Sequence, residues 1–124
     1  MRNQLTQRIR SFRFALRGIA MMLATETNAL IHALATLVVV AAGWAFNLDR
    51  AEWFALILAI TIVWVAEAIN TAIEAVCDAV SLEENAKIGR AKDLAAGAVL
   101  LSAIGATAIA IVVFGRRVVE LFVS

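Results

Sequence analysis

The sequence predicts an all-α membrane protein, in which an N-terminal amphipathic helix lies in the membrane interface and three further helices cross the membrane. Three observations lead to this fold class. Apolar residues make up 63% of the 124 residues, against roughly 45–50% in soluble domains, and the mean hydropathy is +0.88. Proline is absent, so nothing breaks a long helix. Three runs are each long and apolar enough to span a bilayer, and the length suits a single domain over residues 1–124.

Residues 8–25 are predicted to form the interfacial helix. Apolar side chains recur there at intervals of three and four residues and make one continuous stripe. Its members are Ile9, Phe12, Leu16, Ile19 and Leu23. A second stripe is basic and consists of Arg10, Arg13 and Arg17. A helix with these two faces is typical of the plane between water and lipid; a surface helix on a soluble core is less favoured, because so little of the remaining chain could be soluble.

The three predicted transmembrane helices cover residues 29–48, 51–80 and 94–114. The first contains no Asp, Glu, Lys or Arg over about the 20 residues that a span needs. The second follows a short connector and must run back antiparallel. At about 1.5 Å per residue it reaches roughly 45 Å, well beyond a hydrocarbon core of about 30 Å. The third is rich in alanine and glycine, which suits close helix packing in lipid, and residues 81–93 before it are predicted to be a polar linker.

The basic residues predict the orientation. Eight of the 11 lysines and arginines lie before the first span or in residues 81–93, and three lie on the other side. Cytoplasmic segments of membrane proteins carry the excess of Lys and Arg. We therefore expect the N-terminus and residues 81–93 to face the cytoplasm.

Four polar residues are spaced three, four and four apart at the cytoplasmic end of the second span, which places them on one helix face. They are Glu67, Asn70, Glu74 and Asp78, with Thr71 beside them. Counted from Ala51, Glu67 lies about 24 Å along the helix and Asp78 about 40 Å, so only Glu67 is expected at real depth. One polar residue at a helix end often merely solvates the boundary. Four in register favour a function, since ionisable groups in spans are rare and usually functional.

The side-chain types of this face favour a hard cation. Carboxylates without histidine or thiolate partners suit Mg²⁺. His32 and Cys77 are each single in the sequence, which excludes a histidine cluster and an internal disulfide within one chain. Arg90, Lys92 and the basic stripe are expected in the same compartment and can bind phosphate. Acidic metal ligands with basic phosphate-binding groups are typical of phosphoryl transfer, although no P-loop or kinase glycine loop occurs.

The motifs EAINTAIEAVCD (67–78), GRAKDLAAGAVL (89–100) and TETN (25–28) resemble the small bacterial diacylglycerol kinase and undecaprenol kinase family. The resemblance covers roughly residues 8–114. It implies a homotrimer of three-span protomers in the bacterial inner membrane, with active sites shared between protomers at the cytoplasmic interface. It also implies Mg²⁺ and ATP as cofactors and a membrane lipid as the phosphoryl acceptor, with no nucleic acid among the partners.

Carried over position by position, the resemblance implies that Glu67 is the general base for the lipid hydroxyl and that Glu26 and Glu74 hold the magnesium ion. The other implied residues contact or support the nucleotide. They are Arg10, Phe14, Arg17, Asn70, Asp78, Glu83, Glu84, Asn85, Gly89, Lys92 and Asp93. This chain departs from many relatives at Glu84 and Asn85, where those relatives carry a Tyr-His pair.

Several alternatives stay open. Within the lipid-kinase hypothesis the acceptor is either diacylglycerol or undecaprenol, because the polar face meets only the hydroxyl end of the lipid. A non-enzymatic membrane interaction subunit would need only the basic helix and the small residues of the third span. A channel is disfavoured, because the acidic face occupies only the cytoplasmic half of the second span.

Overall fold

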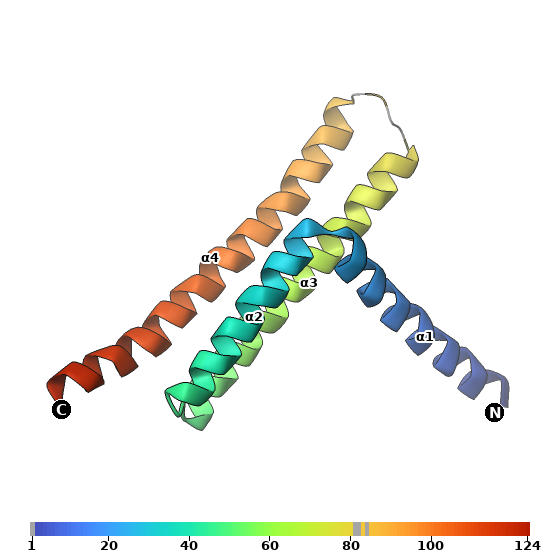
Figure 1. Cartoon of the computed structure of the whole chain (residues 1–124). Helices are drawn as coiled ribbons and strands as arrows, with labels where there is room; N and C mark the ends of the chain where they lie inside the picture. Colours follow the sequence, from blue (N-terminus) through green and yellow to red (C-terminus); the bar gives the residue numbers. More distant parts are fainter. Residues whose placement is uncertain (1, 81–82, 84) are drawn as a thin grey trace.

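The computed structural model describes residues 2–80, 83 and 85–124, and this part of the chain forms four helices with no strand (Figure 1). The helices are α1 (Arg2–Thr25), α2 (Thr27–Ala45), α3 (Arg50–Val80) and α4 (Ala86–Val123). The all-α prediction is confirmed. Three of the helices, α2, α3 and α4, are long and apolar enough to cross a membrane.

α1 leads away from the other three helices (Figure 1). Its junction with α2 is Glu26, whose backbone is extended at φ −100° and ψ 119°, and this one non-helical residue allows the change of direction. The described side chains of α1 are exposed, apart from Met22, which is buried. The helix begins at Arg2 rather than at residue 8, because residues 2–7 contain no helix-breaking glycine or proline.

The turn after α2 makes α2 and α3 run antiparallel. Asn47 adopts a positive φ of 50°. The N–H groups of Asn47 and Leu48 donate to the carbonyls of Trp44 and Gly43, which is the bond pattern of a Schellman motif. Gly43 itself is buried, and a Cβ added there would lie 2.6 Å from Cη2 of Trp53. The absence of a side chain at this position therefore lets the two helices approach closely.

A cluster of charged side chains ties α4 to the start of α3. The carboxylate of Asp49 accepts from the N–H of Glu52, and the carboxylate of Glu52 accepts from the N–H of Asp49, each at 2.9 Å; this is a capping box. Arg117 of α4 donates from Nε and Nη2 to the same Glu52 carboxylate. A small apolar core lies in the same region and consists of Leu48, Leu56 and Val113. Caps, ion pairs and core together fix the end of the bundle at the α2–α3 loop.

α4 is longer than the span predicted at 94–114, because it also takes in the second half of the expected linker and the chain end. Asn85 caps it by accepting hydrogen bonds through Oδ1 from two backbone N–H groups of the first turn. A polar stretch that is capped and lacks proline can continue as helix. Near the other end, Arg116 Nε and Glu120 Oε1 form an ion pair of 3.1 Å at the i,i+4 spacing that supports helices.

Most large apolar side chains of the chain are exposed. Phe12 is 73% exposed, Trp44 72% and Leu101 71%, and similar residues occur along all four helices. A soluble monomer rarely leaves so much contiguous apolar surface in water. The exposure fits helices that are surrounded by lipid or by further copies of the chain.

Gly43→Ala is expected to destabilise the fold by about 1–3 kcal/mol, because the new methyl group would collide with the Trp53 ring. Gly115→Ala is the matched control, since nothing lies within 4 Å of a Cβ at that position. The control should show only the gain in helix propensity of up to about 1 kcal/mol. Thermal unfolding of the detergent-solubilised protein measures both; equal melting temperatures for the two variants would contradict the close approach.

Arg117→Gln should lower the melting temperature more than Arg116→Gln. The side chain of Arg117 is 22% exposed and pairs with the buried Glu52, whereas that of Arg116 is 67% exposed and pairs with Glu120 on the helix surface. Removing Arg117 leaves the buried Glu52 carboxylate without its ion-pair partner and with only the hydrogen bond from the Asp49 N–H. The measurement is again thermal unfolding in detergent, and a larger loss for the Arg116 variant would show that the cluster does not hold α4.

Candidate active site

The polar face of α3 is graded from buried to exposed toward the α3–α4 connection. Glu67 is 1% exposed and Asn70 is 6% exposed. Glu74 is half-buried, and the side chain of Asp78 is 58% exposed. One helix face therefore carries acidic groups from the interior of the bundle to its edge.

Four polar atoms on this part of α3 are buried without a hydrogen-bond partner in the described part of the chain. They are both carboxylate oxygens of Glu67, Oδ1 of Asn70 and Oγ1 of Thr71. An unpaired buried polar group is costly, and nearly all such groups in proteins find a partner. These atoms therefore mark a candidate site, because their hydrogen-bonding capacity is still available to a substrate, an ion or a neighbouring group. Asn70 Nδ2 does donate to Oε1 of Glu74, at 3.4 Å, which orients the second carboxylate.

His32 of α2 lies opposite Glu67. Its Nε2 is 3.5 Å from Oε2 of Glu67, and it is the one ionisable group within ion-pair distance of Glu67 among the described residues. The sequence does not predict that His32 lies near Glu67; a single histidine indicates only that no histidine cluster forms within one chain. A usable signal was present, since His32 is the one ionisable side chain in residues 29–48 and such a residue in a span is a functional candidate.

The predicted metal ligands Glu26 and Glu74 lie at a similar height along the α2–α3 pair. The two helices are antiparallel, and the contact between His32 and Glu67 fixes their register. Glu26 is six residues before His32, about 9 Å along the axis, and Glu74 is seven residues after Glu67, about 10.5 Å. The Glu26 side chain is half-buried and makes no capping hydrogen bond to α2. Its carboxylate is therefore not used by the helix start.

The available ligands fit magnesium in kind. No group of three or more His, Cys, Asp or Glu side chains gathers as a metal cage within the residues that the structure describes. Magnesium usually takes only one or two protein carboxylates and fills its shell with water and substrate phosphates. Glu26, Glu74 and the unpaired Oδ1 of Asn70 supply oxygen, the donor type that a hard cation prefers.

The start of α4 meets the exposed end of the acidic face. Lys92 Nζ is 2.6 Å from Oδ1 of Asp78, and both side chains are more than a third exposed. Gly89 and Asp93 are exposed nearby on α4, and no atom lies within 4 Å of a Cβ on Gly89. This part of α4 is thus an open surface with a cation at its centre.

The α1 residues predicted for the nucleotide lie on a helix that leads away from this surface (Figure 1). The guanidinium of Arg10 lies 5.6 Å from the ring centroid of Phe14, a cation–π contact. Both residues and Arg17 are exposed. The fold of one chain therefore presents these groups outward from its own bundle.

The predicted residues between α3 and α4 have different surroundings. Asn85 caps α4 through its side-chain oxygen, so a structural role accounts for that oxygen. Glu83 is exposed. Glu84 lies outside the described residues.

Three membrane-length helices and a graded carboxylate face beside a partly exposed lysine define the class, a helical membrane protein with a candidate active site. The profile of the prokaryotic diacylglycerol kinase family matches residues 13–114. The chain belongs to this family.

Two relatives agree with the family assignment. The undecaprenol kinase of Bacillus subtilis (strain 168) is 35% identical over 113 residues, which cover 91% of this chain and 92% of that protein. The diacylglycerol kinase of Synechocystis sp. is 41% identical over 99 residues, which cover 77% of this chain. The match takes in only 55% of the Synechocystis protein, so the chain spans about half the length of that relative.

Proposed function

We propose that this protein transfers the γ-phosphoryl group of ATP to the hydroxyl of a membrane lipid, at the end of the bundle where α3 and α4 are connected. The observation that carries the proposal is the graded face of α3, with two unpaired carboxylate oxygens at its buried end. A lipid hydroxyl arrives from the membrane side and a nucleotide from the water side. A face that runs from buried to exposed can meet both.

Glu67 is proposed as the general base. The lipid oxygen attacks the γ-phosphorus, the bond from that phosphorus to the bridging oxygen of ADP breaks, and Glu67 accepts the hydroxyl proton. Its burial supports this role, because the hydroxyl of a lipid lies at the membrane boundary rather than in bulk water. Positioned proton transfer of this kind contributes typically about 10²–10⁴-fold to a rate.

Glu26 and Glu74 are proposed to hold a magnesium ion. When bound, such an ion neutralises charge on the phosphates, which is a principal source of catalysis in phosphoryl transfer. The similar height of the two carboxylates along α2 and α3 supports the assignment. The hydrogen bond from Asn70 to Glu74 would keep one ligand in place before the ion arrives.

Lys92 is proposed to contact the ATP phosphates, with Asp78 orienting its ammonium group. Gly89 and Asp93 lie on the same stretch of α4, and Asn85 caps that helix. The position of these three residues at the exposed end of the face supports a nucleotide rather than a lipid contact. Glu83 and Glu84, which precede Asn85 in the sequence, are proposed to serve the same nucleotide.

The α1 residues Arg10, Phe14 and Arg17 are proposed to serve a site on a neighbouring copy. α1 leads away from its own α3 and α4, and the apolar faces of the helices are unpartnered in one chain. A homotrimer with shared sites would use both features. The basic residues of α1 and of the start of α4 support an orientation with this end at the cytoplasmic side of a bacterial inner membrane.

An assay with labelled ATP across a panel of lipids tests the function and its acceptor. The purified protein should phosphorylate undecaprenol or diacylglycerol only when magnesium is present, and side-by-side initial rates identify the preferred lipid. Both acceptors present a hydroxyl at the interface beneath a long apolar tail, so the panel needs both. Absence of phosphorylation of every lipid would leave a non-enzymatic membrane subunit as the better interpretation.

Glu67→Gln and Glu74→Gln separate the two proposed carboxylate roles. The Glu67 variant should lose about 10²-fold or more in kcat at saturating magnesium, because the amide cannot accept the proton. The Glu74 variant should need about 10-fold or more magnesium for half-maximal rate. Glu120→Gln, at the far end of α4, is the matched control and should behave as wild type. Wild-type turnover in either test variant would remove the role proposed for that residue.

A further inference from the structure

The imidazole of His32 lies within ion-pair distance of a buried carboxylate that has no hydrogen-bond partner among the described residues. Nε2 lies 3.5 Å from Oε2 of Glu67, with side-chain exposures of 18% and 1%. Neither oxygen of Glu67 has a hydrogen-bond partner among the described residues. The distance is longer than a good N–H···O bond. Catalytic hydrogen bonds are often long before substrate binds and tighten in the reacting complex.

We propose that His32 is a positioning residue for the phosphoryl transfer: it donates a hydrogen bond from Nε2 to Oε2 of Glu67 and leaves Oε1 free to take the proton of the lipid hydroxyl. This inference rests on the proposed function, in which Glu67 is the base. A carboxylate has two oxygens, and fixing one of them sets the direction of the other. Without a second contact, the long Glu67 side chain could rotate away from the acceptor.

The surroundings of His32 hold the ring in place. Thr36, one turn along α2, donates its hydroxyl to the backbone carbonyl of His32 at 2.7 Å. The same hydroxyl accepts from Nε1 of Trp64 on α3 at 3.1 Å. Trp64 also makes an edge contact with the imidazole, at a centroid distance of 6.3 Å and an angle of 66°. Two side-chain pairs, His32 with Glu67 and Thr36 with Trp64, therefore join α2 and α3 one turn apart.

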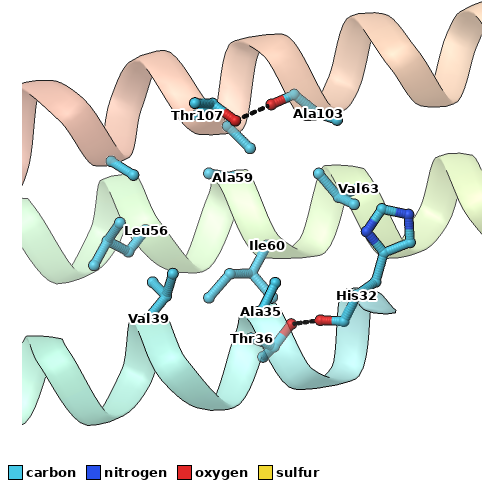
Figure 2. Close-up of a pocket in the computed structure, with 12 residues that line it drawn as sticks. His32, Ala35, Thr36, Val39, Leu56, Ala59, Ile60, Val63, Ala103 and Thr107 are labelled. Carbon is cyan, nitrogen blue, oxygen red and sulfur yellow. Dashed lines mark hydrogen bonds between the residues drawn. The ribbon is translucent and has the colours of Figure 1, made fainter. Parts of the chain in front are cut away.

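The cavity beside His32 has few polar side chains that could contact Glu67 in place of the imidazole. A cavity of about 170 Å³ between α2, α3 and α4 has His32 at one end, and Figure 2 shows the ring beside Val63. Its other lining residues are mostly alanine, valine, leucine and isoleucine, with Thr36 and Thr107 as the polar exceptions. The hydroxyl of Thr107 donates to the carbonyl of Ala103 at 2.7 Å. Among the polar side chains that line this cavity, His32 is therefore the one within ion-pair distance of Glu67.

Two substitutions at His32 test whether it acts through Glu67. His32→Leu removes the donor and should lower kcat about 10- to 100-fold, the size expected for a misplaced catalytic group, with KM for ATP and lipid within about twofold. His32→Gln keeps an N–H at similar reach and should recover most of kcat. Thr107→Val changes the same cavity without touching Glu67 and is the control. In a Glu67→Asp background, His32→Leu should cost much less than in wild type, because residues that act together are not additive.

A spectroscopic measurement on the unliganded protein keeps the inference testable if His32→Leu fails to fold. The chain has a single histidine, so ¹⁵N-histidine labelling gives the ring nitrogens of His32 alone. The Nε2 resonance should move in Glu67→Gln and stay in place in Glu74→Gln. An Nε2 signal unaffected by Glu67→Gln, or wild-type kcat in His32→Leu, would overturn the positioning role. Failure of wild-type protein to phosphorylate any lipid would instead overturn the proposed function.

Discussion

The Glu67 carboxylate is buried with no hydrogen-bond partner among the residues that the structure describes, and the rest of the site depends on this constraint. An isolated charge in an apolar helix bundle is costly, and chains keep such groups in membranes mainly for function. The oxygens of Glu67 need an imidazole, a substrate hydroxyl or both. Oδ1 of Asn70 and Oγ1 of Thr71 are likewise buried without a hydrogen-bond partner among the described residues. The polar face of α3 therefore keeps hydrogen-bonding capacity that the described residues leave unused.

The opposite end of the bundle sets the geometry of this site. Three contacts fix how the end of α2, the start of α3 and the end of α4 lie against one another: the tight turn after α2, the close approach of Gly43 and Trp53, and the contact of Arg117 with Glu52. Helices are stiff, so a register fixed at one end is carried to the other. That register brings His32 opposite Glu67. Apolar contacts and ion pairs at the α2–α3 loop thus determine which side chains lie together at the candidate active site.

The sequence was sufficient for the helices and for the depth order along α3, because both depend on local spacing and hydropathy. It misplaced the start of α4, since the polar residues after Asn85 resemble a linker but form a capped, water-exposed helix. It did not find His32 as a neighbour of Glu67, because the pairing joins residues 35 apart and depends on the register of two helices. Roles for Arg10 and Arg17 depend on helix directions that periodicity alone does not give.

The direction of α1 also constrains how a complete site can be assembled. Its basic and aromatic side chains Arg10, Phe14 and Arg17 are exposed on a helix that leaves the bundle, while the acidic face stays on α3. Phosphate needs cations and metal-binding carboxylates within a few ångströms of one another. The proposed sharing of sites, in which α1 of one copy reaches α3 of another, would bring these groups together. In the proposed assembly, the contact that completes the site would also cover apolar helix faces that one chain leaves exposed.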